Sequence, residues 1–160
     1  RSGLPGEKAN AGFGKALAGT DGGADGCGDL VIGAPFATVD DRRGAGAVYV
    51  VEGGRRWSRK VEAQLLAGRP VLGRTPAPGD FLGSSLAVLD WNGDGRDDVA
   101  IGAHGVAVGG REDAGALVIV EGGRSRFLPS RRTVLTQRRP LADRPEPGDQ
   151  FSSSLQDAHS

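Results

Sequence analysis

Four carboxylates and one carboxamide lie within the nine residues DWNGDGRDD, Asp90 to Asp98, directly before the apolar run VAIGA. Ionised carboxylates held about 4 to 6 Å apart repel one another unless a cation lies among them. A chain that places this much negative charge beside an apolar strand is therefore predicted to bind a metal ion there.

The spacing of these polar residues favours a hard cation such as Ca²⁺. Positions 1, 3, 5 and 9 of the stretch carry side-chain oxygens, and Gly95 at position 6 permits the sharp turn that such a loop needs. An all-oxygen shell suits Ca²⁺ better than zinc. Asp97 is expected to point away from the loop into solvent. The expected ligands are the side chains of Asp90, Asn92, Asp94 and Asp98 and the backbone carbonyl of Arg96.

An EF-hand does not explain this loop, because position 12 is Ile101 rather than glutamate and the flanks SSLAVL and VAIGA are of strand type. The stretch is instead predicted to join two strands of a β-hairpin. One alternative stays open, since Asn92-Gly93 and Asp94-Gly95 are also turn dipeptides, and a turn alone needs no metal. A turn does not require aspartate at positions 1, 5 and 9 together, which favours the metal loop.

The other reactive side chains do not form a catalytic set. The run GSSLA, residues 83–87, is superficially like a nucleophile elbow, but it lies inside a predicted strand rather than at a strand-to-helix turn. Cys27 is at a loop position that offers only its backbone carbonyl. His104 and His159 are the two histidines of the sequence, too few to build a zinc site. The chain is therefore expected not to be an enzyme.

The chain repeats itself at a constant offset, the one that separates Leu17 from Leu86. LAGTDGGADGCGDLVIGAP from Leu17 aligns without a gap with LAVLDWNGDGRDDVAIGAH from Leu86, and GAGAVYVVEGGR aligns with DAGALVIVEGGR. A third copy begins at the same offset, because PEPGDQFSSSL, ending at Leu155, repeats PAPGDFLGSSL, ending at Leu86. The predicted units are residues 1–66, residues 67–135, and residues 136–160 as a linker and the start of a third repeat.

Each repeat is predicted to hold four strands, because short apolar runs alternate with glycine- or proline-rich turns and helical periodicity is absent. A four-stranded antiparallel unit repeated in tandem is typical of β-propeller blades. Glycines at Gly14, Gly33, Gly83 and Gly102 suit strands crowded near a propeller axis. The predicted strands are 13–20, 30–34, 45–52, 61–66, 82–89, 99–103, 114–121 and 133–135.

These units resemble FG-GAP repeats, the blades of the integrin α-subunit propeller and of many bacterial secreted proteins. The resemblance lies in FGKAL with DGCGDLVIGAP and GAVYV, and in LGSSLAVLDWNGDGRDDVAIGA with GALVIV. It covers two repeats and the start of a third, about 2.3 repeats in an all-β chain. It implies a propeller of about seven blades, calcium in the hairpin loops, and adhesion or ligand binding rather than catalysis.

The first loop, DGGADGCGD, departs from this pattern. It offers the side chains of Asp21, Asp25 and Asp29 and the carbonyl of Cys27, but Gly23 stands at position 3, where a water would have to replace the missing ligand. The second unit has His104 where the family pattern has proline. His159 occupies the position that matches Asp21, which counts against a third site.

Composition excludes several classes of protein. A formal net charge of zero, without a basic cluster and interleaved aromatics, argues against nucleic-acid binding. No apolar run is long enough to span a membrane. Cys27, the only cysteine, cannot form an internal disulfide. Because the chain opens at Arg1 without methionine, it is expected to be an excerpt of a longer protein that contributes further blades to close the propeller.

The expected function is that of a calcium-binding propeller segment of a secreted or cell-surface protein, with a protein or glycan ligand at loops 36–44 and 105–113. Trp57 and Trp91 are either recognition residues or packing residues, and the basic pairs at 131–132 and 138–139 are expected to guard a solvated edge strand. One alternative is the non-catalytic propeller of a larger secreted hydrolase, lipase-like or phospholipase-like. Another is a complete small protein that closes its sheet by oligomerising.

Overall fold

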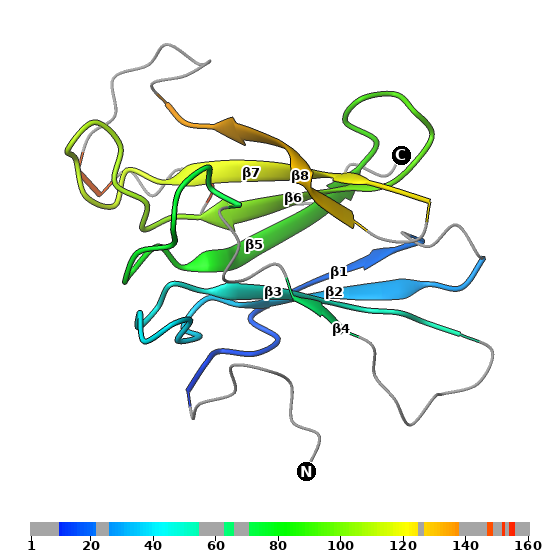
Figure 1. The fold of residues 1–160 in the computed structure, drawn as a ribbon, viewed down its shortest axis with the longest axis horizontal. Helices are drawn as coiled ribbons and strands as arrows, with labels where there is room; N and C mark the ends of the chain where they lie inside the picture. The colour runs from blue at the N-terminus through cyan, green and yellow to red at the C-terminus, as the bar shows by residue number, and fades with distance from the viewer. Residues whose placement is uncertain are drawn as a thin grey trace.

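The protein is all-β in the part of the chain that the computed structural model describes. That part comprises residues 10–21, 26–54, 63–65, 71–124, 127–137, 147–148, 152 and 154–155, and it contains strands and turns but no helix. Figure 1 shows the strands gathered into two layers, one above the other. The chain therefore forms two sheets in tandem, as the repeat predicts.

Each sheet has four antiparallel strands in sequential order, which is the meander of a propeller blade. The first blade holds β1 Ala16–Thr20, β2 Asp29–Ala34, β3 Ala47–Val51 and β4 Ala63–Leu65. The second blade holds β5 Leu82–Leu89, β6 Asp98–Ala103, β7 Ala116–Gly122 and β8 Phe127–Leu135. All eight predicted strands are present, and the bounds of β5 match the prediction.

Two strand predictions are wrong by three residues or more at their start, and those for β2, β3, β6 and β7 differ from the observed bounds by one or two residues. The first strand begins at Ala16 rather than Phe13, because a turn closed by the Lys15 N–H and the Gly12 carbonyl, 3.0 Å apart, precedes it. The last strand begins at Phe127, well before its predicted start at residue 133, and pairs with β7 across a register shift. Bulges of this kind interrupt the alternation from which strands are predicted. Residues 61, 62 and 66 of the predicted fourth strand lie outside the described part.

The interior strands bury apolar residues on both faces. Along β2 and β3, alternate residues contribute to different clusters: Val31, Val48 and Val50 face the second blade, whereas Ile32 and Tyr49 face the opposite way. In β6 and β7 the same alternation sends Ile101 and Val118 toward the first blade and Ala100 and Ile119 away from it. A period of two with both faces apolar is what a central propeller strand needs.

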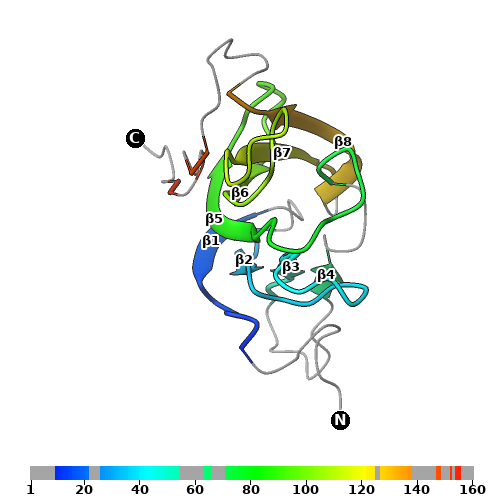
Figure 2. The same cartoon turned by 90° about the vertical axis from the view of Figure 1, so that its left-hand side faces the viewer.

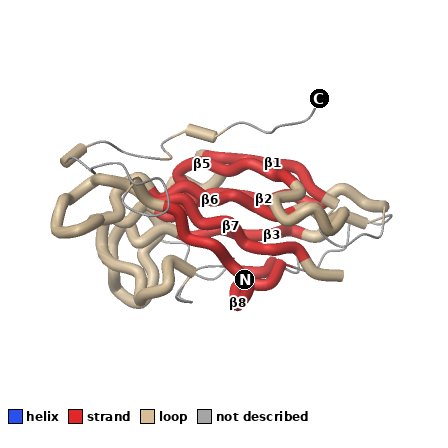
Figure 3. The backbone as a smooth tube through the Cα atoms, turned by 90° about the horizontal axis from the view of Figure 1, so that it is seen from above, coloured by secondary structure: helices blue, strands red, loops and turns tan. Residues whose placement is uncertain are grey.

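The two blades meet through β5, which contacts β1, β2 and β3 of the first blade. Figure 2 shows β5 beside β1, and Figure 3 shows the strands of the two blades running in similar directions. Leu86 on β5 is only 5% exposed because it enters the cluster formed with Ala18, Val31 and Val50. Burying a leucine side chain contributes about 1.5 to 3 kcal/mol, so this strand is a main apolar anchor of the interface.

Glycine lets the blades approach closely, as predicted for three of the four positions. A Cβ on Gly33 would collide with the Gly83 carbonyl of the second blade, and a Cβ on Gly102 would collide with the Ser152 carbonyl at the start of the third repeat. Gly83 itself has a φ of 86° and lies against the Ala47 carbonyl. The prediction of crowding is wrong for Gly14, because nothing lies within 4 Å of its Cβ position, and its φ of 82° is the feature that favours glycine.

The start of the third repeat docks on the second blade. Ser152 accepts a hydrogen bond from the Ser85 hydroxyl at its carbonyl (2.6 Å) and donates one from its own hydroxyl to the Ala116 carbonyl (2.6 Å). Leu155 packs against the cluster of Ala87, Ala100 and Ile119. Leu86 is the repeat counterpart of Leu155 and makes the corresponding contact with the first blade, so the blade interface is itself repeated.

Candidate metal loops

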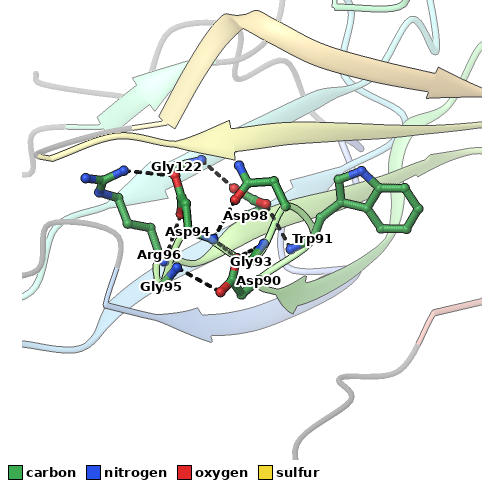
Figure 4. A network of polar contacts seen from close by, with 9 residues as sticks. Asp90, Trp91, Gly93, Asp94, Gly95, Arg96, Asp98 and Gly122 are labelled. Carbon is green, nitrogen blue, oxygen red and sulfur yellow. Dashed lines mark hydrogen bonds and ion pairs between the residues drawn. The ribbon is translucent and has the colours of Figure 1, made fainter.

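The second loop, residues 90–97, links β5 to β6 at one end of the second blade and is fully described. Its first aspartate, Asp90, gathers the backbone around itself: Oδ1 accepts from the N–H groups of Gly93 (2.8 Å) and Asp94 (3.0 Å), and Oδ2 accepts from Gly95 (2.8 Å). Asn92 Oδ1 accepts from the Asp94 N–H at 2.9 Å. Figure 4 shows these N–H groups turned toward the Asp90 carboxylate. The loop is thus a hairpin connection wound around its own side-chain oxygens.

Asp94 is directed toward Arg96 rather than toward Asp90. Its Oδ1 accepts from the Arg96 backbone N–H at 3.0 Å, and its Oδ2 forms an ion pair with the Arg96 guanidinium at 2.9 Å. Both side chains are more than one-third exposed, so solvent weakens this pair. The guanidinium therefore lies where it balances charge in the loop.

Asp98 has a different role from the other loop aspartates, because it is fully buried. Its Oδ2 accepts from the Trp91 N–H at 2.9 Å, and its Oδ1 accepts from the Gly122 N–H at 2.8 Å (Figure 4). The first blade repeats the second of these bonds, since Asp29 Oδ1 accepts from the Gly53 N–H at 2.8 Å. The aspartate at loop position 9 thus fastens the loop to the end of the third strand.

Sequence reasoning missed the glycines that complete this contact, although the repeated EGGR at the end of each third strand was a usable signal. A Cβ on Gly53 would collide with the Gly28 carbonyl, and a Cβ on Gly122 would collide with the Asp97 carbonyl. Only glycine lets the strand end approach the loop closely enough for its N–H to reach the buried carboxylate.

The donor set fits a hard cation by its chemistry. Each carboxylate oxygen pair has about four acceptor positions, and the hydrogen bonds present fill only part of them at Asp94 and Asp98. The arrangement is not closed into a shell, because no three acidic, histidine or cysteine side chains converge on one point in the described ranges. Binding of an ion by all predicted ligands therefore requires the carboxylates to draw together.

The first loop is described only in part. Asp21 is exposed, Cys27 is half-buried and Asp29 is buried, whereas Gly23 and Asp25 lie outside the described residues. The structure thus places Asp29 as the counterpart of Asp98, and it leaves the predicted first site a prediction. His159 and Trp57 also lie outside the described residues.

The prediction for Asp97 is wrong in one respect. Its side chain does leave the loop, but it is half-buried against the first blade instead of pointing into solvent. Asp97 Oδ2 accepts from the Thr20 hydroxyl at 2.9 Å and from the Asp21 backbone N–H at 3.0 Å. These partners belong to the first blade and are far from Asp97 in the sequence. The spacing of residues within the second loop therefore could not predict them.

Three other predicted features have clear positions. Trp91 is half exposed, and Figure 4 shows its ring extending away from the carboxylates. Ser85 is buried in β5, and its hydroxyl donates a hydrogen bond to the Ser152 carbonyl, so its role there is structural. Arg131 lies exposed on β8, the edge strand of its sheet, as expected, while Arg138 and Arg139 lie outside the described residues.

The chain forms two tandem four-stranded antiparallel sheets that pack face to face. In each sheet an aspartate-rich hairpin loop joins the first two strands. These sheets are blades of a β-propeller. Comparison with known proteins names the kind of blade. Residues 13–51 and 82–120 match the family model of the FG-GAP repeat, which spans β1 to β3 and β5 to β7. The chain is therefore an FG-GAP repeat protein with two such repeats in its described part.

Its curated relatives include two kinds of protein. Integrin alpha-7 of Rattus norvegicus is 40% identical over 102 residues, which are 62% of this chain and 8% of the integrin. Phosphatidylinositol-glycan-specific phospholipase D is 36% identical over 110 residues in Mus musculus and 41% identical over 96 residues in Homo sapiens, covering 69% and 59% of this chain. The matches span 13% and 11% of those phospholipases, so the chain corresponds to a small part of each relative.

Proposed function

We propose that this chain is a non-catalytic, calcium-binding part of an FG-GAP propeller that presents its loops to a protein or glycan ligand outside the cell. The observation that carries the proposal is the Asp90–Asp98 loop, which is wound around carboxylate and carboxamide oxygens at the end of a blade that packs through apolar contacts. The calcium is structural, because it would fix the hairpin and thereby the rim of the propeller.

The ion would be held in the second loop by the side chains of Asp90, Asn92, Asp94 and Asp98 and by the Arg96 carbonyl. Its charge would offset the repulsion between the carboxylates, a task that the loop N–H groups and the Arg96 guanidinium perform in part. In the first loop the corresponding groups are the side chains of Asp21, Asp25 and Asp29 and the Cys27 carbonyl. Weak sites of this kind suit the millimolar calcium found outside cells.

Further FG-GAP blades would complete the propeller, and the first blade exposes apolar side chains against which another blade could pack. Leu17 and Leu30 are 58% and 40% exposed, whereas their repeat counterparts Leu86 and Val99 are 5% and 0% exposed because they face the other blade. Phe13, 45% exposed, corresponds in the same way to Leu82 at 1%. Each exposed residue of the first blade and its buried counterpart in the second blade are apolar, so the same kind of contact is expected at both blades.

The ligand would bind at the opposite end of the blades from the metal loops. There the β2–β3 loop, 36–44, and the β6–β7 loop, 105–113, each contain a short bridge, Val39 with Arg42 and Val108 with Arg111. Such braced loops can carry variable side chains without disturbing the sheet.

No helix of the described part is long and apolar enough to cross a membrane.

A second candidate function follows from the likeness to phosphatidylinositol-glycan-specific phospholipase D. In that case the chain would be the propeller portion of a larger secreted hydrolase, and the chemistry would be performed elsewhere in the protein. Both candidates assign the same structural role to the metal loops. Sequence on either side of this chain separates them, since additional copies of the same repeat favour the adhesion protein and a catalytic motif favours the hydrolase.

Calorimetric titration with calcium tests the metal assignment, residue by residue. Asp94→Ala should remove more calcium-dependent stabilisation than Asp25→Ala, because the loop that holds Asn92 has a ligand where the other has Gly23. A Kd of about 0.1 to 1 mM corresponds to roughly 0.6 to 1.8 kcal/mol of stability at about 2 mM calcium. Gly23→Asn should strengthen the first site. Equal losses from both alanine variants, with no gain from Gly23→Asn, would mean that the loops are turns and the assignment is wrong.

A further inference from the structure

One polar contact crosses the interface between the blades next to both metal loops. Asp97 Oδ2 accepts the Thr20 hydroxyl at 2.9 Å and the Asp21 backbone N–H at 3.0 Å. Thr20 ends β1 and is 7% exposed, and Asp97 directly precedes β6 and is half-buried. A carboxylate of the second loop thus holds the first residue of the first loop.

The repeat shows that this contact is special to this pair of blades. The counterpart of Asp97 in the first blade is Gly28, which has no side chain, and the counterpart of Thr20 in the second blade is Leu89, which has no hydroxyl. Apolar side chains and closely packed glycines recur at both interfaces, but this hydrogen-bonded pair cannot recur. The Asp97–Thr20 hydrogen bond is therefore not part of the repeated pattern of contacts between blades.

We propose that Asp97 is a positioning residue that couples the Asp90–Asp98 loop to the first blade. Its neighbours in sequence are Arg96 and Asp98, two residues of the proposed calcium shell, so an ion that fixes both also fixes the backbone that carries Asp97. Calcium in the second loop would then strengthen the hold on Thr20 and Asp21. The calcium step rests on the proposed function, whereas the hydrogen bonds themselves do not.

The coupling must act in both directions, because linkage between two equilibria is reciprocal. If calcium tightens the contact between Asp97 and the first blade, then loss of that contact must weaken calcium binding by the same factor. A hydrogen bond to a charged acceptor that is partly withdrawn from water changes an equilibrium by about tenfold. The expected effects are therefore large enough to resolve for a single residue.

Amide hydrogen exchange, followed by NMR on the ¹⁵N-labelled chain, tests the proposal at two reporter groups. The Asp21 N–H reports the contact between the blades, and the Gly95 N–H, bound to Asp90, reports the second loop itself. Without calcium, Asp97→Ala should speed exchange at Asp21 by about tenfold, whereas Asp97→Asn, which keeps an acceptor oxygen, should restore much of the protection. Asp40→Ala, an exposed acid in the β2–β3 loop, is the matched control.

The comparison is made in chains that also carry Asp25→Ala, because calcium in the first loop would itself change exchange at Asp21. In that background calcium should slow exchange at Gly95 in every variant and slow exchange at Asp21 only where residue 97 keeps its acceptor. Thr20→Val, which retains the branched shape but lacks the hydroxyl, should give an intermediate response at Asp21. An Asp21 amide that responds to calcium equally in the parent chain and in Asp97→Ala overturns the coupling. A Gly95 amide that never responds to calcium overturns the proposed function instead, and the calcium-free comparison then decides whether Asp97 holds the first blade.

Discussion

Substitution of Gly83 by alanine offers a sharp test of the blade interface, because the repeat supplies its own control. Gly83 and its counterpart Gly14 have nearly the same backbone conformation, with φ of 86° and 82°. They differ in surroundings: a Cβ on Gly83 would lie 2.7 Å from the Ala47 carbonyl and 3.0 Å from Val48 Cγ2, and a Cβ on Gly14 would meet nothing within 4 Å. The pair therefore separates backbone strain from crowding between blades.

Both substitutions should cost stability through the left-handed backbone, by about 1 to 2 kcal/mol each. Ser152, the third counterpart, adopts a φ of 68° without being glycine, so this conformation is tolerated by an L-residue. Gly83→Ala should cost a further 1 to 3 kcal/mol, roughly, because the blades must move apart to admit the methyl group. A difference of about 2 kcal/mol moves the urea midpoint by about 1 M when the m-value is about 2 kcal/mol/M.

Urea unfolding of the parent chain and both variants, followed by circular dichroism, measures this difference. The m-values should agree among the three, since the same surface is exposed on unfolding. Equal midpoints for Gly83→Ala and Gly14→Ala would refute the reasoning, because crowding at β5 would then contribute nothing. A larger loss at Gly14 than at Gly83 would refute it as well.

The burial of individual side chains and the absence of a catalytic set lead to three further predictions. Asp98→Ala should lower the free energy of unfolding by about 1 to 3 kcal/mol, because it leaves a buried backbone N–H without an acceptor. Asp94→Ala changes an exposed side chain, so without calcium it should lower the free energy of unfolding by less than about 1 kcal/mol. Thermal unfolding of both variants in the presence of a chelator measures the difference. Leu17→Ser should reduce self-association in sedimentation without unfolding the chain, and its buried counterpart Leu86→Ser should unfold it. The purified chain should not hydrolyse generic esters or phosphodiesters, and turnover abolished by Ser85→Ala would contradict the non-catalytic assignment.

Much of the blade could be predicted from the sequence because its information is local. The short apolar runs at 30–34 and 99–103, bounded by turn residues, predict strands. The polar residues at every second position of DWNGDGRDD predict a hairpin loop rich in oxygen donors. The constant offset between like segments, as from Leu17 to Leu86, predicts tandem units before any contact is known. Each of these signals depends on the order of consecutive residues, which the sequence determines by itself.

Only the tertiary structure decided what the individual carboxylates do. Asp98 and Asp97 are adjacent in the sequence and identical in chemistry, yet one is buried against Gly122 at the end of β7 and the other crosses to Thr20 in the other blade. The partners are 24 and 77 residues away, so they are set by strand pairing and by blade packing. Those are long-range contacts, formed by the summed burial of many side chains, and no spacing within a single loop can encode them.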